Sequence, residues 1–119
     1  MIPYRFYSLP VTVAAGSATS SAIRIHGQVA FGVSVPASVD GERLGFEVRE
    51  DATQPFRLFH DASGVVTVPL VANAYVALPQ EQMRSLASFA DIRLVTLDAS
   101  GNPVNQTSDA TFRIYTATI

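Results

Sequence analysis

The chain has 119 residues, the size of one folded domain, and its composition is 48% apolar and 15% charged. This balance excludes a disordered chain, and the absence of cysteine excludes disulfides, thiolate chemistry and cysteine-based zinc sites. A net charge of −2, with eight arginines spread along the chain and no lysine, argues against a general nucleic-acid binder.

The first ten residues are aromatic and bracketed by Pro3 and Pro10, which limits backbone freedom and disfavours a helix. We therefore expect residues 1–10 to form an extended N-terminal arm. The strand-like pattern begins after it, so we expect residues 11–119 to form a single β-sandwich domain.

Short runs that alternate between apolar and polar side chains recur along this second part, separated by turn signals. A period of two is typical of strands with one buried face. The predicted strands are Val11–Val13, Ile23–His26, Val29–Val35, Leu44–Arg49, Phe56–Phe59, Val65–Val68, Ala74–Leu78, Ile92–Leu97 and Ala110–Ile119.

The tetrapeptide Asp-Ala-Ser-Gly occurs twice, at Asp61–Gly64 and at Asp98–Gly101. The aspartate can accept a hydrogen bond from the backbone two residues on, and the glycine adopts a positive φ at low cost. Neither segment has the several spaced oxygen ligands of a calcium loop. We expect plain turns next to antiparallel strands.

One stretch near residues 79–90 has a helical period instead. Pro79 suits the first position of a helix. The apolar residues that follow recur at i, i+3, i+4 and i+7, so they would share one stripe. They are Met83, Leu86, Ala87 and Ala90.

Many short strands with a single helix predict an all-β fold, because parallel strands would need a crossover helix for each pair. We expect an antiparallel β-sandwich with jelly-roll or Greek-key order and one short helix near 79–90; the sequence does not decide between the two orders. The expected core is Leu44, Phe46, Val48, Phe56, Leu58, Val66, Val68, Val76, Ile92, Leu94, Phe112 and Ile114.

The sequence offers no set of residues typical of catalysis. His26 and His60 are the only histidines, and they do not supply the three or four ligands that zinc needs. The nucleophile-elbow pattern and a glycine-rich phosphate loop before a helix are both absent. We expect no catalytic residue, no metal and no cofactor, and therefore a protein that is not an enzyme.

Binding candidates come from the arm and the last strand. Aromatic residues beside arginine are typical of interface anchors, although the same residues can complete the edge of a sandwich. The last predicted strand is apolar, and an exposed edge would pair with another chain. The predicted partner-binding residues are Tyr4, Arg5, Phe6, Tyr7 and Tyr115.

An ordered series of turns and core positions resembles the β-sandwich decoration, or cement, proteins of tailed-bacteriophage capsids. The segments that carry it are Val11–Val13, Ser21–Ile23, Phe31–Pro36, Leu44–Val48, Pro55–Gly64, Ala74–Pro79 and Phe89–Leu94. The resemblance covers residues 11–119 and rests on pattern rather than on functional residues. The aromatic arm departs from it, which leaves the mode of attachment open.

The resemblance implies a virion structural protein on the capsid surface, assembled in the cytoplasm of the bacterial host. Its partner would be the major capsid protein, whose subunits it would bridge, and it would be a homo-oligomer, with a trimer favoured. No apolar run approaches the ~20 residues that span a bilayer, so no membrane partner is expected. The net charge of −2 gives the same expectation for nucleic acid.

Two other functions stay open. Jelly rolls often bind sugars, so a carbohydrate-binding module is an alternative, although the chain lacks tryptophan for an aromatic platform. A tail or head-fibre subunit is the other alternative.

Overall fold

The computed structural model describes residues 5–25 and 27–118. Tyr4 and His26, both singled out from the sequence, lie outside the described residues. The strands are β1 (Phe6–Val13), β2 (Gln28–Ser34), β3 (Arg43–Arg49), β4 (Arg57–Leu58), β5 (His60–Asp61), β6 (Gly64–Val65), β7 (Thr67–Pro69), β8 (Tyr75–Ala77), β9 (Asp91–Leu97) and β10 (Ala110–Thr118), and the helix α1 is Gln80–Leu86.

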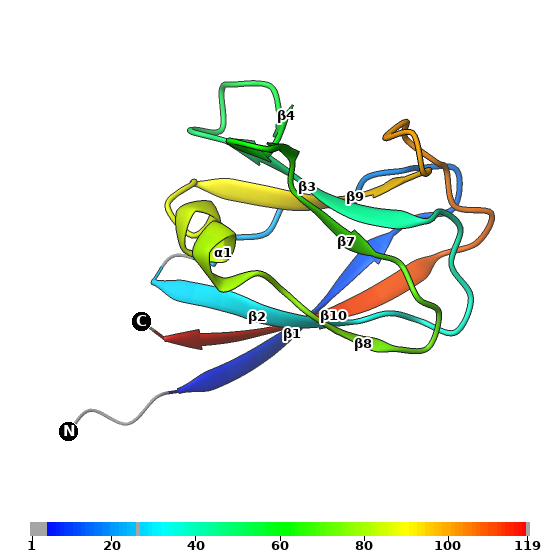
Figure 1. The fold of residues 1–119 in the computed structure, drawn as a ribbon, viewed down its shortest axis with the longest axis horizontal. Coiled ribbons are helices and arrows are strands. Elements are labelled where there is room, and N and C mark those ends of the chain that lie inside the picture. The colour runs from blue at the N-terminus through cyan, green and yellow to red at the C-terminus, as the bar shows by residue number, and fades with distance from the viewer. Residues whose placement is uncertain (1–4, 26, 119) are drawn as a thin grey trace.

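The strands form two layers with a core between them (Figure 1). The first sheet has the order β1-β10-β2-β8, and every pair in it is antiparallel. In the second sheet β3 is central, with β9 on one side and β7 and β4 along the other. The strands β5 and β6 form a separate small hairpin. The predicted all-β antiparallel sandwich is confirmed.

The pairing follows the order of a jelly roll, in which a long hairpin of strands is wrapped into two sheets. Strand β1 pairs with β10, β2 with β8 and β3 with β7. The fourth pair consists of residues 17–23 and β9, joined by antiparallel bridges of Thr19 to Val95 and of Ile23 to Ile92. The first half of the chain therefore pairs with the second half in reverse order.

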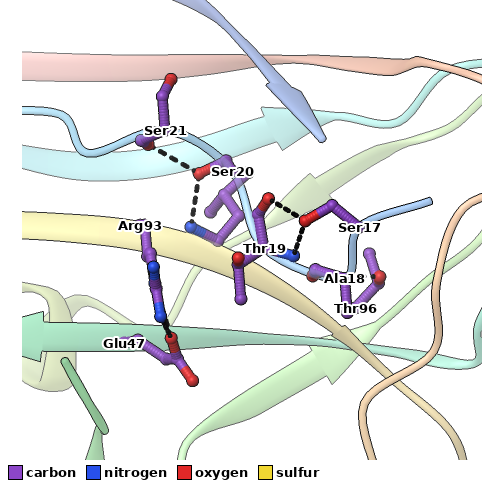
Figure 2. Close-up of polar contacts among 9 residues, drawn as sticks. Ser17, Ala18, Thr19, Ser20, Ser21, Glu47, Arg93 and Thr96 are labelled. Atoms are coloured by element: carbon purple, nitrogen blue, oxygen red, sulfur yellow. Dashed lines mark hydrogen bonds and ion pairs between the residues drawn. The ribbon is translucent and has the colours of Figure 1, made fainter. Parts of the chain in front are cut away.

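Residues 17–23 are held to β9 partly by side chains rather than by a continuous ladder (Figure 2). The Ser20 hydroxyl donates to the carbonyl of Ser21 at 2.9 Å and accepts from the backbone N–H of Leu94 at 2.9 Å. Serine and threonine hydroxyls offer the backbone such local alternatives to a ladder. The predicted strand Ile23–His26 is therefore wrong in its described part, where Ile23 makes a single bridge.

Both Asp-Ala-Ser-Gly turns form as predicted. The carboxylate of Asp61 accepts from the N–H of Ser63 at 2.7 Å, and that of Asp98 accepts from the N–H of Ser100 at 2.8 Å. The glycines that end the turns have φ of 131° and 86°. The first turn connects β5 to β6, and the second follows β9.

The helix is shorter than predicted and starts one residue later. Pro79 precedes it with extended ψ of 118°, so it is the N-cap residue and not the first helical one. Met83 and Leu86 are fully buried in the core. The helix ends because the next N–H groups, from Ser88 and Phe89, bond three residues back rather than four. Figure 1 shows α1 at one end of the sandwich.

Nine of the twelve predicted core residues are buried, and three are only partly buried. Val76 packs at the margin of the core. Leu58 pairs opposite Glu47, on the outer side of the second sheet. Phe56 lies under two guanidinium groups, with Arg49 and Arg93 at 4.4 and 4.2 Å from its ring centroid. Leu58 and Phe56 therefore belong to a polar surface rather than to the interior.

The predicted boundary between the arm and the sandwich falls inside one strand. β1 pairs with β10 without interruption from Phe6 to Val13. The N–H of Thr118 donates to the carbonyl of Arg5 at 2.9 Å. The backbone N–H and C=O groups of every second residue from Arg5 onward therefore point toward β10. Pro10 has the opposite parity, and its missing N–H costs the sheet no hydrogen bond.

Candidate functional site

Four aromatic rings, one from each strand of the first sheet, form a continuous series on its outer side. Phe6 lies edge-on to Phe31 with ring centroids 5.9 Å apart, and Phe31 lies 6.3 Å from Tyr115. Tyr115 in turn lies 5.6 Å from Tyr75. We call this surface the aromatic face. Aromatic pairs at these distances stabilise one another beyond the area that they bury.

Alternation along β10 places these rings outside the core. Phe112, Ile114 and Thr116 are buried, whereas Arg113 is exposed and Tyr115 is partly exposed. At the two ends of the series, Phe6 is 69% exposed and Tyr75 is 54% exposed. Aromatic side chains that are packed yet exposed provide a rigid apolar contact surface.

A bulge brings Phe31 to the outer side. Tyr115 pairs with Gly32, but the next residue of β10 pairs with Ala30, so Phe31 is the extra residue. Bulges re-aim a side chain in this way. The Tyr75 ring packs directly over Gly32: a Cβ added to Gly32 would lie 1.8 Å from the Tyr75 hydroxyl oxygen. The absence of a side chain at this position therefore lets the ring lie close to the sheet.

Few polar groups accompany the rings. The Ser34 hydroxyl lies 3.4 Å from the Tyr115 hydroxyl, and Nη1 of Arg113 donates to the Ser8 hydroxyl at 3.1 Å. Burial of Tyr75, followed by the nearby phenol of Tyr115, raises the pKa of the Tyr75 hydroxyl. The Tyr75 phenol therefore stays neutral and can donate a hydrogen bond at all ordinary pH values.

The structure divides the residues that the sequence singled out for partner binding. Phe6 and Tyr115 lie on the aromatic face, both in contact with Phe31. Tyr7 has the opposite parity on β1, so its side chain projects to the other side of the sheet, and Arg5 lies just before the start of β1. The fifth predicted residue, Tyr4, lies outside the described residues.

Sequence reasoning missed Phe31 and Tyr75. Phe31 lies in a run that alternates as a plain strand, and the bulge that turns it outward depends on pairing with β10, far along the chain. Tyr75 pairs opposite Ser34. The one available signal was the small residue at Gly32 within a strand, which indicates a bulge or a close approach.

The outer side of the second sheet carries ion pairs instead. The carboxylate of Asp91 accepts from Nε of Arg49 at 2.8 Å and from Nε of Arg24 at 3.0 Å. Hydrogen bonds from Arg49 and then Arg24 hold the pKa of Asp91 below its usual range. Arg93 pairs with Glu47 at 2.6 Å (Figure 2). Both carboxylates of this cluster are paired with arginines, which is typical of a structural network.

A shallow hollow of about 240 Å³ includes Arg49 of this network in its lining, together with Arg57, His60 and Phe89. Within residues 5–25 and 27–118, no group of three or more histidine or acidic side chains is placed to hold a metal ion. In the same part of the chain, no helix has the length and apolar character to cross a bilayer.

Comparison with known proteins bears on the fold. No protein-family model matches the chain, and no curated protein matches its sequence. Among solved structures, the chain is similar to the SPBc2 prophage-derived protein YomS, with a TM-score of 0.56. The match covers 99% of this chain and 97% of YomS at 10% sequence identity. At this identity the likeness shows a shared fold over nearly the whole of both chains.

Proposed function

We propose that this chain is a structural protein of a bacteriophage virion, and specifically a decoration or cement protein. It binds the outer surface of the capsid and stabilises it by bridging subunits of the major capsid protein. The aromatic face is the contact surface. The observation that carries the proposal is the series Phe6, Phe31, Tyr115 and Tyr75 on one side of a sheet, with its two end residues Phe6 and Tyr75 exposed.

Binding through this face costs little conformational entropy. Rings that already pack against one another on a sheet lose little side-chain entropy when a partner covers them. Their burial releases water from a large apolar area, and aromatic residues dominate the affinity of many interfaces. A protein that bridges capsid subunits needs a rigid contact surface and no conformational change.

Two further observations support the phage setting. The structural neighbour YomS is a prophage-derived protein and matches nearly the whole chain. The order of turns and core segments in the sequence resembles capsid decoration proteins. The proposal includes the absence of catalysis and cofactors, assembly in the host cytoplasm, a place on the virion surface, and a homo-oligomer, with a trimer favoured.

The test is co-sedimentation with empty capsids assembled from the major capsid protein encoded with this chain. Wild-type protein should bind saturably, and the double substitution Phe6→Ala with Tyr75→Ala should lower the affinity at least about tenfold. Val65→Ala is the matched control, because Val65 is 39% exposed but lies on the β5–β6 hairpin. If the wild-type protein does not co-sediment with capsids, or if the double variant binds them equally well, the proposal is overturned. Substitutions are better suited than deletion of residues 1–10, which would remove Phe6 to Pro10 and so most of the eight residues of β1.

A carbohydrate-binding module is the second candidate, favoured by the exposure of Phe6 and Tyr75 on a sheet face. Exposed rings can stack on the apolar side of a sugar, although tryptophan, the best platform, is absent. A glycan array decides: a signal abolished by the same double substitution would favour sugar binding over capsid binding. Electron microscopy of labelled virions separates a third possibility, a tail or head-fibre subunit.

A further inference from the structure

Charge is distributed unevenly between the two layers of the sandwich. The four strands of the first sheet contain no acidic residue, so all ten aspartates and glutamates of the chain lie elsewhere. Arg113 is the only charged residue in those four strands. Arg113 is therefore the only charge that these strands contribute to the aromatic face.

Among residues 5–25 and 27–118, no acidic side chain forms an ion pair with Arg113. Its cross-strand neighbours are Pro10 and Ser34, both uncharged. Its side chain donates to the neutral Ser8 hydroxyl at 3.1 Å. All three ion pairs found among the described residues lie around β3 and β9. The Ser8 contact orients the guanidinium on the outer side of the sheet without neutralising it.

We infer that the aromatic face docks onto a protein surface that presents a carboxylate, and that Arg113 pairs with this carboxylate. The inference rests on the proposed function and names the chemistry of its partner. A guanidinium on the same sheet face as exposed aromatic side chains pairs strongly with a carboxylate once the interface excludes water. Complementary charge at such a position fixes register and orientation as well as affinity.

Other anionic partners fit the face less well. Nucleic acids and polyanionic sugars are bound through several phosphate or acid contacts at once, and their binding needs a basic patch. The aromatic face offers one cation among neutral residues. One carboxylate on an otherwise apolar protein surface is the complement that these residues favour.

The absence of lysine makes a direct test possible. Arg113→Lys keeps the positive charge and introduces the only side-chain amine of the chain. A water-soluble carbodiimide activates a carboxylate, and an amine within contact distance displaces the resulting urea to form an amide. In the capsid complex, the amine introduced at position 113 should become linked to an aspartate or glutamate of the major capsid protein, identified by mass spectrometry of the joined peptides.

The matched control is Arg84→Lys, which introduces an amine at an exposed position in the last turn of α1, outside the four strands of the first sheet. This variant should bind capsids but give no such link. Independently, Arg113→Glu should lower the affinity at least about tenfold, whereas Arg113→Lys should stay within about threefold of wild type.

The outcomes separate the inference from the proposed function. If the Phe6→Ala, Tyr75→Ala double variant fails to bind but the Arg113→Lys complex gives no capsid link and Arg113→Glu binds normally, the face is correct and the acidic partner is wrong. If none of the variants changes binding, the aromatic face itself is wrong. If the amine of the Arg113→Lys variant becomes linked only to nucleic-acid phosphate, the partner of the face is a nucleic acid. If Arg113→Glu weakens binding to acidic glycans but not to capsids, the partner is an acidic glycan.

Discussion

Gln106 is a buried polar residue that joins three loops at one end of the sandwich. Its Nε2 donates to the carbonyl of Asp40 at 2.8 Å and to the hydroxyl of Thr96 at 3.1 Å, while its Oε1 accepts from the N–H of Asp40 at 2.9 Å. Its backbone exchanges hydrogen bonds with Gly16 and Ser17. The side chain thus satisfies loop groups that no strand reaches.

Gln106→Ala should lower the free energy of unfolding by ~1–3 kcal/mol, because it removes a buried side chain and leaves the partly buried backbone N–H and C=O of Asp40 without their partners. Urea unfolding followed by circular dichroism measures the change. Asn105→Ala, at the exposed neighbouring position, is the control and should stay within ~0.5 kcal/mol of wild type. Equal midpoints for all three proteins would show that the loops hold without this side chain.

Asp91 links acid sensitivity to the network on the second sheet. The hydrogen bonds from Arg49 and Arg24 lower the pKa of its carboxyl in the folded state. A lowered pKa means that the folded state binds the proton less tightly than the unfolded chain does. The stability from this group is therefore present above the ordinary aspartate pKa of ~3.9 and is lost as the pH falls through the folded value.

Asp91→Asn should therefore lower the urea midpoint at neutral pH and make the midpoint fall less steeply between about pH 4 and pH 2. The measurement is a series of urea unfolding curves across this range. Glu42→Gln removes an exposed carboxyl and serves as the control. A variant whose midpoint tracks wild type in parallel at every pH would refute the role of Asp91.

At the scale of the strand, Gly32 determines whether β2 and β8 can share one surface. Gly32→Ala places a Cβ where the Tyr75 ring lies, so the ring must move off the sheet and away from Tyr115. The pKa of Tyr75, raised by burial and then by Tyr115, should return toward its ordinary value. Difference absorbance of tyrosinate across an alkaline titration, compared with Tyr75→Phe, isolates this group.

Ser34→Ala is the control, because it changes the residue paired opposite Tyr75 but keeps Gly32, over which the Tyr75 ring packs. In wild type the raised pKa favours the neutral phenol, so its contribution to stability is present below ~pH 10 and is lost as the pH rises further. An unchanged Tyr75 titration in Gly32→Ala would show that the ring does not depend on the glycine. Capsid affinity should fall with the same substitution.

The elements could be predicted from local pattern where the pattern reports burial. The alternation in Leu44–Arg49 and in Ala110–Thr118 gave strands whose inward residues are buried. The two Asp-Ala-Ser-Gly turns followed from the chemistry of single side chains. These features depend on residues within a few positions of one another, so sequence reasoning reaches them.

Features set by distant pairing could not be predicted in this way. The bulge at Phe31 depends on β10, and residues 17–23 bond to β9 about 70 residues away through the Ser20 hydroxyl. Phe56 is apolar and was therefore predicted in the core, yet its ring packs against the guanidinium groups of Arg49 and Arg93. The aromatic face as a whole needs the strand order β1-β10-β2-β8, which no local signal contains.

At the scale of the whole molecule, the jelly-roll order separates two surfaces of different character. Pairing β1 with β10 and β2 with β8 gathers into one sheet four strands whose only charged residue is Arg113. The other sheet carries the carboxylates and arginines of the ion-pair network. A molecule with one neutral aromatic side and one charged side is suited to lie flat on a partner, with the charged side toward water.

Electron cryomicroscopy of empty capsids saturated with the protein tests this orientation directly. The outer side of the β1-β10-β2-β8 sheet should face the shell, with Phe6, Tyr75 and Arg113 inside the contact and the β3–β9 side toward solvent. Density in which the β3–β9 side meets the shell, or in which the aromatic rings remain uncovered on the virion, would contradict it.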